Sequence, residues 1–242
     1  MALWYRLLAA AFLLFTALPA SYAPSQTVNP EGLISAGHRW PKGESIFVCW
    51  QGASPGTYIQ ERAWVQAAIT GTLVGSWSFV GWGECSSTKT HHITITIIDE
   101  GKPQDRYDSR SLVGRQPGGA PTQMWMNFTY QKWSNGTVCD TDAERCVKVI
   151  AVHEFMHALG VLHEQNRDDV PKHCLDSRVA NDANPGDARP VGSFCARSIT
   201  NYCTLDASGQ MQFTMYERNW SRTRRRVDLA DCDSETLRAL SN

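Results

Sequence analysis

The sequence predicts an α+β domain, in which short strands alternate with amphipathic helices along 242 residues. Residues 46–50 form a short apolar run, which is typical of a buried strand. Residues 92–98 and 122–128 alternate apolar and polar side chains, the period of a strand with one buried face. Residues 65–73 carry an apolar side chain at every fourth position, which indicates a helix packed on the sheet. A chain of this length can bury one core, divided into two lobes around a cleft.

Local signatures place the remaining elements. The pairs Thr57-x-x-Gln60 and Thr141-x-x-Glu144 have the spacing of capping boxes, so we expect a helix to begin at each. Residues 101–121 are rich in Gly, Pro and charge and read as a loop. Residues 164–210 show little periodicity, which predicts an irregular lobe. A short helix over residues 234–240 closes the chain.

Residues 1–23 have the layout of a secretory signal peptide. Arg6 is the only charge before an apolar run at 7–18, and small residues follow it. The run is short for a membrane span, so we expect a secreted, extracellular protein without stable membrane insertion. Residues 24–40 are polar and form an N-terminal arm or a short pro-segment, ahead of a catalytic domain at 41–242.

The overall charge gives no sign of a polyanionic partner. The 23 basic residues are balanced by 24 acidic ones, so no strong field favours nucleic acid or an anionic membrane. A local basic run at 222–226 reads either as a solvated face or as a binding module. Three asparagines begin N-x-S/T sequons that a glycosylating host can use: Asn127, Asn135 and Asn219.

Eight cysteines follow the signal peptide, and their even number predicts disulfides in an oxidising compartment. None lies in a CxxC pair, which argues against a cysteine-ligated zinc knuckle. Cys139 with Cys146 is the most local pairing. Because eight cysteines allow 105 pairings, the residues alone leave the rest of the map open.

The strongest chemical signal is a histidine pattern at 153–163. His153 and His157 are four residues apart, so on a helix both imidazoles reach one point. Gly160 can take positive φ, end the helix and turn the chain so that His163 becomes a third ligand. Three neutral imidazoles with an open fourth position are typical of one catalytic zinc ion. Glu154 lies one residue round the helix and is our candidate for the catalytic base.

This pattern, HExxHxxGxxH, is the metzincin signature, and the residue after the third histidine, Glu164, matches the astacin type. The run HEFMHALGVLHEQN at 153–166 resembles astacin-related secreted peptidases, as do residues 48–50 and 81–85. The resemblance implies a metzincin-type fold: a twisted, mostly parallel sheet with a backing helix, an active-site helix and an irregular, disulfide-linked C-terminal lobe. It also implies an antiparallel edge strand along the cleft, for which residues 122–128 are our candidate.

The resemblance bears on the disulfides too. It pairs Cys49 with Cys85. Cys174 with Cys203 would join the loop after His163 to the turn that contains Tyr202, and Cys195 with Cys232 then remain.

One position departs from the family. Metzincins carry a methionine turn beneath the metal, but here Ser198–Tyr202 has Thr200 in place of the methionine. We therefore expect weaker packing, and expect Thr200→Met to raise stability or zinc retention, unless a neighbour already matches the threonine. Tyr202 matches the astacin tyrosine, which binds the metal loosely and assists the oxyanion. Glu164 engages the trimmed N-terminus in that family.

The sequence thus predicts a secreted zinc endopeptidase that acts as a monomer on protein or peptide substrates. Glu154 would move protons, and Tyr202 would stabilise the oxyanion. Three alternatives stay open: a catalytically impaired homologue that keeps zinc and binds partners, a hydrolase of another ester or amide bond, and a binding module on the basic run.

Overall fold

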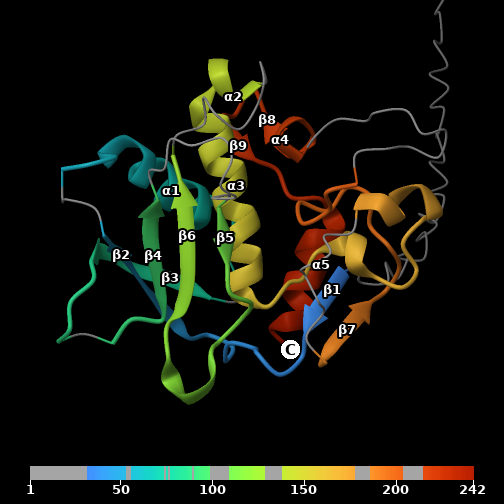
Figure 1. The fold of residues 1–242 in the computed structure, drawn as a ribbon, viewed down its shortest axis with the longest axis horizontal. Coiled ribbons are helices and arrows are strands. Elements are labelled where there is room, and N and C mark those ends of the chain that lie inside the picture. The colour runs from blue at the N-terminus through green and yellow to red at the C-terminus, as the bar shows by residue number, and fades with distance from the viewer. Residues whose placement is uncertain are drawn as a thin grey trace, which may run out of the picture.

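The computed structural model describes residues 32–52, 56–73, 75, 77–88, 90–98, 109–128, 138–177, 186–203 and 215–242. A five-stranded sheet lies on one side of a long central helix and an irregular lobe lies on the other (Figure 1). The helices are α1 (Ile59–Thr72), α2 (Val138–Thr141), α3 (Ala143–Leu159), α4 (Met215–Arg218) and α5 (Asp231–Leu240). The strands are β1 (Gly32–Ser35), β2 (Ser45–Gln51), β3 (Ser78–Glu84), β4 (Ile93–Ile98), β5 (Arg110–Ser111), β6 (Thr122–Asn127), β7 (Ala188–Val191), β8 (Trp220–Ser221) and β9 (Arg226–Val227).

The large sheet has the order β3-β2-β4-β6-β5. The first four strands are parallel to one another, and β5 is antiparallel to β6. The prediction that residues 122–128 form the antiparallel edge is therefore wrong, because β6 lies between β4 and β5 and runs parallel to β4. The edge is β5, whose two residues are too few for any periodicity and fall in the segment that we predicted as loop.

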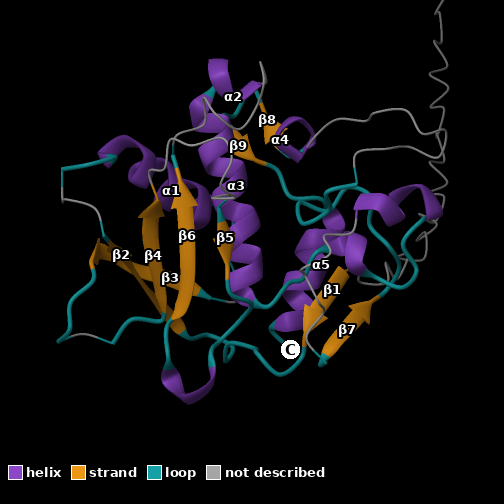
Figure 2. Ribbon diagram, in the orientation of Figure 1, coloured by secondary structure: helices purple, strands orange, loops and turns teal. Residues whose placement is uncertain are grey.

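Apolar side chains on one face of the sheet pack against α1 and α3, which lie side by side (Figure 2). Fully or almost fully buried there are Ile46, Val48, Trp50, Ile93, Ile95, Met124 and Met126. Val65 and Ile69 of α1, and Leu73 at its C-cap, are buried as the helical spacing predicted. Phe155 of α3 meets Phe79 of β3 edge-on, with ring centroids 5.4 Å apart. The core thus fixes α3 against the sheet.

Both helix starts differ from the predicted capping boxes. The residue before α1 is Tyr58, which has left-handed φ (55°) and makes no side-chain cap, so the prediction of a cap at Thr57 is wrong. The N-cap of α3 is Asp142, one residue after Thr141, and its carboxylate accepts from the Arg145 N–H. At the other end of the chain, α5 begins at Asp231, three residues before the predicted start.

The described part of the N-terminal segment, residues 32–40, is folded into the domain rather than loose. The strand β1 pairs antiparallel with β7, and Leu33 and Ile34 are buried. Arg167 ties β1 to the irregular lobe, since its guanidinium donates to the carbonyl oxygens of Gly32 and Gly192. Residues 1–23, which we predicted as a signal peptide, and residues 24–31 lie outside the described residues.

Four disulfides join all eight cysteines in the predicted pairs, Cys49–Cys85, Cys139–Cys146, Cys174–Cys203 and Cys195–Cys232. Two of the sequon asparagines, Asn127 and Asn219, are almost fully buried, so neither side chain is accessible for glycosylation in the folded chain. Among the described residues, no helix is long and apolar enough to cross a membrane.

Candidate metal centre

The candidate site lies on the second half of α3, which is buried at almost every position. A helix covered on both sides holds its side chains in fixed directions, so His153 and His157 leave the same face one turn apart. Gly160 ends the helix with φ of 109°, and its N–H reaches the carbonyl oxygens of Met156 and His157. This left-handed residue is the predicted turn, and it brings His163 back toward the helix.

The three histidines meet at one point. The Nε2 atom of His157 lies 3.0 Å from that of His153 and 3.0 Å from that of His163, and the remaining pair is 3.3 Å apart. His153 and His157 are buried, and His163 is half-buried. The structure therefore brings together the three side chains that the motif singled out.

Hydrogen bonds at the other ring nitrogen fix the tautomers. Nδ1 of His153 lies 2.9 Å from the carbonyl oxygen of Ile199, and Nδ1 of His157 lies 2.7 Å from that of Val161. A carbonyl oxygen only accepts, so each ring donates its Nδ1–H and presents a bare Nε2 lone pair. Burial first, and then the two neighbouring imidazoles, hold the pKa of His153 well below its ordinary value, which keeps this ring neutral.

This donor set fits zinc. The bare nitrogens of His153 and His157 cannot hydrogen-bond to each other, so a cation between them fits their 3.0 Å approach. At the usual zinc–nitrogen distance, three nitrogens on one tetrahedral ion stand about 3.3 Å apart, close to the spacings found here. The imidazoles of His153 and His157 are each oriented by a backbone carbonyl, as zinc-binding imidazoles usually are.

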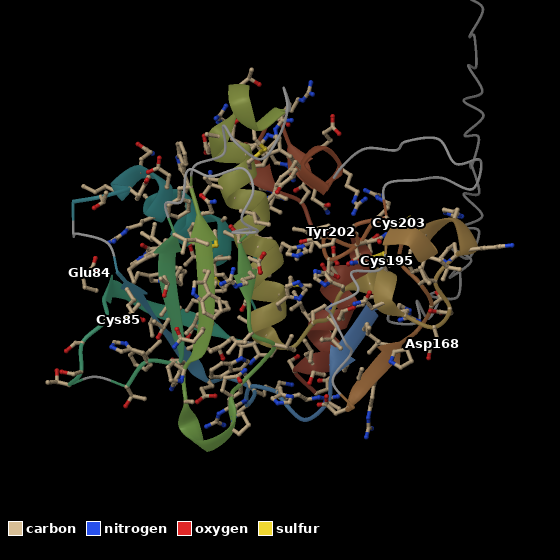
Figure 3. All side chains as sticks on the ribbon, in the orientation of Figure 1. Glu84, Cys85, Asp168, Cys195, Tyr202 and Cys203 are labelled. Carbon is tan, nitrogen blue, oxygen red and sulfur yellow. A yellow bond between two sulfur atoms is a disulfide. The ribbon has the colours of Figure 1, made fainter. Side chains whose placement is uncertain are left out.

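Two further predicted residues lie at this point. The phenol oxygen of Tyr202 is 2.9 Å from Nε2 of His153, and its ring lies 4.8 Å from that of His163, centroid to centroid. Figure 3 shows Tyr202 between α3 and the irregular lobe. Glu154 directly follows His153 on the helix and is 1% exposed. Their chemical roles stay predictions.

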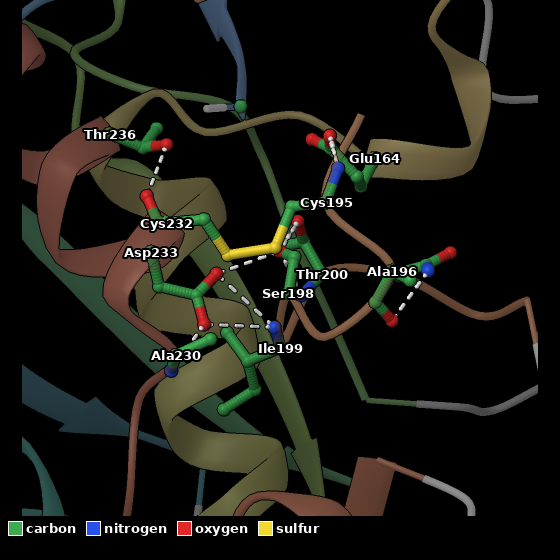
Figure 4. The surroundings of a disulfide bond; sticks show 12 residues. Glu164, Cys195, Ala196, Ser198, Ile199, Thr200, Ala230, Cys232, Asp233 and Thr236 are labelled. Atoms are coloured by element: carbon green, nitrogen blue, oxygen red, sulfur yellow. Dashed lines mark hydrogen bonds between the residues drawn. A yellow bond between two sulfur atoms is a disulfide. The ribbon is translucent and has the colours of Figure 1, made fainter. Parts of the chain in front are cut away.

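The turn Ser198–Tyr202 lies against α3 and is held by polar side chains (Figure 4). The buried carboxylate of Asp233 accepts from the Ser198 hydroxyl at 2.7 Å and from the Ile199 N–H at 3.1 Å. Thr200 is fully buried, and its Oγ1 lies 2.9 Å from Oγ of Ser198. The threonine hydroxyl therefore has a partner, which removes the reason for expecting weak packing at this position.

Sequence reasoning missed three residues around this turn. Arg218 donates to the carbonyl oxygens of Ser198 and Asn201, Asp233 accepts as described, and Gln165 accepts from the Tyr202 N–H at 3.0 Å. Burial raises the pKa of Asp233 to about 6 and lowers that of Arg218 to about 10. Asp233 lies in an acidic stretch that reads as a solvated helix face, and Arg218 lies in a segment without periodicity, so no pattern pointed to them.

Glu164 lies immediately beyond the third histidine and is fully buried. Its carboxylate accepts from the Cys195 N–H at 2.8 Å, and Nε of Arg167 lies 3.6 Å from it. Burial raises the pKa of Glu164 to about 7. The N-terminal residues that the family resemblance would bring here lie outside the described part of the chain.

Comparison with known families supports the resemblance. The sequence model of the Astacin peptidase family matches residues 126–184, a segment that contains Glu154 and all three histidines. No curated protein sequence matches the chain.

Comparison with solved structures shows the fold. Myroilysin superposes with a TM-score of 0.55 at 16% sequence identity, over 87% of this chain and 98% of that one, so the two chains share a fold. High choriolytic enzyme 1, a hatching enzyme zinc-protease from the medaka fish Oryzias latipes, gives a TM-score of 0.47 at 16% identity. That comparison covers 88% of this chain and 99% of the medaka enzyme.

Proposed function

We propose that the protein is a zinc metalloendopeptidase in which His153, His157 and His163 are the zinc ligands and Glu154 is the base. The match of residues 126–184 to the Astacin peptidase family and the grouping of the three histidines support this proposal. One observation carries this assignment: three imidazoles, two of them oriented by backbone carbonyls, and one phenol converge on a single point. A site with three protein ligands and an open position is the arrangement of catalytic rather than structural zinc.

The chemistry follows from the charges at this point. Zinc, when bound, supplies a Lewis acid that polarises the scissile carbonyl and acidifies water. Glu154 accepts the proton of the attacking water and later delivers it to the leaving amine.

Tyr202 donates a hydrogen bond to the oxyanion that develops on the substrate. Its phenol lies where the three histidine Nε2 atoms meet, and its backbone belongs to the turn Ser198–Tyr202. Little reorganisation is therefore needed when negative charge develops on the substrate oxygen. The carbonyl oxygens of Ile199 and Val161 keep the imidazoles of His153 and His157 oriented through the reaction.

The substrate is a protein or peptide in extended conformation. Leu112 forms a hydrogen bond from its N–H to Gln123 of β6, so the adjacent residue Ser111 turns its backbone N–H and C=O away from the sheet. A peptide strand can pair with this edge, and β5 lies beside α3. The predicted role of the cleft edge thus passes from residues 122–128 to β5.

The test compares two glutamates on α3. Glu154→Gln should retain one zinc per chain and lose casein or peptide cleavage almost completely. Glu144→Gln, near the start of the same helix, loses ion pairs with Lys148 and Arg225 and should cleave at the wild-type rate. Undiminished cleavage in Glu154→Gln contradicts the assignment of the base.

A second candidate is an impaired homologue that binds zinc without cleaving, for which Thr200 is the motivation. The same assay decides between the two candidates. If the unmutated protein holds one zinc ion but cleaves neither casein nor peptide, it is an impaired homologue. The binding module on the basic run has less support: Arg224 and Arg226 pair with Asp228, and Arg225 pairs with Glu144. These three arginines therefore already have carboxylate partners within the chain.

Export of the protein is part of the proposal. Four disulfides are typical of an oxidising compartment, and the signal peptide predicted at 1–23 would direct the chain there. Mass spectrometry of the protein from the culture medium would give its mature N-terminus. A chain that stays in the cell and starts at Met1 contradicts secretion.

A further inference from the structure

Two chain segments lie side by side next to the point where the three histidine Nε2 atoms meet. One follows the third histidine and contains Glu164 and Gln165, and the other is the turn that ends at Tyr202. The Glu164 N–H donates to the carbonyl oxygen of Thr200 at 3.2 Å, and the Tyr202 N–H donates to Oε1 of Gln165 at 3.0 Å. The position of Tyr202 is therefore tied to the same segment that carries His163.

The peptide group between Asn201 and Tyr202 is held at both ends by side chains. Its N–H goes to Gln165, and its carbonyl oxygen accepts from the guanidinium of Arg218. Directly after it, Cys203 is fixed by the disulfide with Cys174. Since this peptide group carries the α-carbon of Tyr202, its orientation sets where the phenol stands.

Gln165 is fully buried, and nothing else described so far requires an amide there. Its Nε2 has no hydrogen-bond partner among the described residues. The amide oxygen satisfies the Tyr202 N–H, although one amide donor is left unused in the interior. This acceptor is the contact through which Gln165 acts on the position of Tyr202.

We propose that Gln165 is a positioning residue that holds the phenol of Tyr202 at the point where the three histidine Nε2 atoms meet. The inference rests on the proposed function of this site and adds the residue that sets its geometry. A group displaced by about 1 Å can lose on the order of 100-fold in rate, so a single hydrogen bond at this peptide has a measurable consequence.

The main experiment uses the protein loaded with Cu²⁺, because a phenolate bound to Cu²⁺ gives a charge-transfer band in visible light. We expect the band in the wild type and its loss in Tyr202→Phe. Gln165→Met, which has the same length but no acceptor, should weaken or shift the band. Thr236→Val removes another buried hydrogen bond, on α5, and should leave the band unchanged.

Kinetics on the zinc protein give the second measurement. Gln165→Met should lower kcat about 10-fold with KM nearly unchanged, at one zinc per chain. In the Tyr202→Phe background the same substitution should have no further effect on kcat, because the phenol that it positions is gone. A purely structural role would lower kcat by the same factor in both backgrounds.

Every outcome decides the proposal. An unchanged band in Gln165→Met, or no band in the wild type, overturns it. If Gln165→Met does not fold, Gln165→Asn is measured instead, since it keeps the amide but withdraws the acceptor by one methylene. If the copper band responds as expected but the zinc protein cleaves nothing, the proposed function fails while the positioning role of Gln165 stands.

Discussion

The two sides of α3 are held together by different forces. On the sheet side, one large apolar cluster joins β2, β4 and β6 to the helices. On the other side, Ile199 joins this large cluster, and the described lobe has two small clusters of its own, each built around a disulfide, Cys174–Cys203 and Cys195–Cys232. Between these clusters, side chains such as Asp233, Arg218 and Arg167 bind backbone groups directly. The sheet side is therefore specified by apolar pattern, and the lobe by single polar contacts and covalent links.

The residues that we propose as zinc ligands and catalytic groups come from both sides. His153, Glu154 and His157 come from α3, which the sheet side fixes, whereas Tyr202 comes from the lobe. His153 itself is oriented by the carbonyl of Ile199, so even a ligand from the helix depends on the lobe. Changes on the sheet side should then act on global stability, and changes in the lobe should act on the site.

The largest effect should come from removing disulfides, and two bridges allow a matched comparison. Cys49–Cys85 on the sheet side and Cys195–Cys232 in the lobe span 36 and 37 residues. In the chain-entropy description, loops of this length contribute about 4 kcal/mol each. We expect replacement of either pair by alanine to lower the free energy of unfolding by about this amount, measured in urea.

The two variants should differ locally. Without Cys195–Cys232, the turn at Ser198 loses its covalent link to α5, so limited proteolysis should cut the lobe first and zinc should dissociate faster. Without Cys49–Cys85, the parallel pairing of β2 with β3 still holds that region, and zinc should dissociate at the wild-type rate. Equal rates of zinc dissociation in the two variants would contradict the idea that the lobe acts on the metal site more strongly than the sheet side does.

The next effect tests the apolar side alone. Ile95 is fully buried at the centre of the sheet, so Ile95→Ala removes methyl groups from a site that cannot collapse freely. We expect a loss of about 3 kcal/mol in the free energy of unfolding. In the folded fraction the zinc content and the cleavage rate should be unchanged. A proportional loss of zinc would show that the sheet also acts on the metal centre.

The same contrast explains what the sequence could predict. Strands β4 and β6 and the helix at Val65–Leu73 were predicted from apolar periodicity, because burial on a regular element repeats at a fixed interval, and β2 was predicted from a short apolar run. The three histidines were found by their spacing. Residues four apart lie on one face of a helix, and a glycine after the helix can turn the third histidine back toward it. Arg218, Asp233 and the edge strand β5 were missed, because a single polar contact or a two-residue strand leaves no period. For Thr200 the sequence left two outcomes open for a related reason, since its partner Ser198 is visible only in the folded turn.

A smaller effect should come from Asp233, the polar anchor of the lobe. Asp233→Asn replaces one acceptor oxygen by an amide that faces the N–H groups of Ile199 and Ala230. We expect a loss of about 2 kcal/mol in the free energy of unfolding at pH 5, together with faster zinc release. The control Asp231→Asn changes an exposed residue on the same helix and should be neutral.

The contribution of Asp233 to the free energy of unfolding should change with pH in a definite direction. Burial raises the pKa of Asp233 to about 6, above the ordinary value of 3.8, so the folded chain holds this proton more tightly than the unfolded chain does. The contribution of Asp233 to stability is therefore complete below about pH 4 and falls as the pH rises toward 6. Denaturation of the metal-free protein should show the difference between wild type and Asp233→Asn shrinking over this range. A difference that grows with pH contradicts the raised pKa.

The smallest effect concerns Thr200, and here the structure reverses the expectation from the family pattern. A methionine at this position would need room, but Thr200 is fully buried, and its hydroxyl and N–H both meet Oγ of Ser198. Its carbonyl oxygen accepts from the Glu164 N–H, so the backbone cannot shift without disturbing the segment after His163. We therefore expect Thr200→Met to overpack the turn and to lower the free energy of unfolding by about 1–2 kcal/mol. Two controls separate volume from polarity: Thr200→Val keeps the shape and removes the hydroxyl, and Thr200→Ser keeps the hydroxyl and removes a methyl group. If Thr200→Met instead raises the melting temperature and slows zinc release, the turn has unused space and the methionine of the family pattern is the better fit.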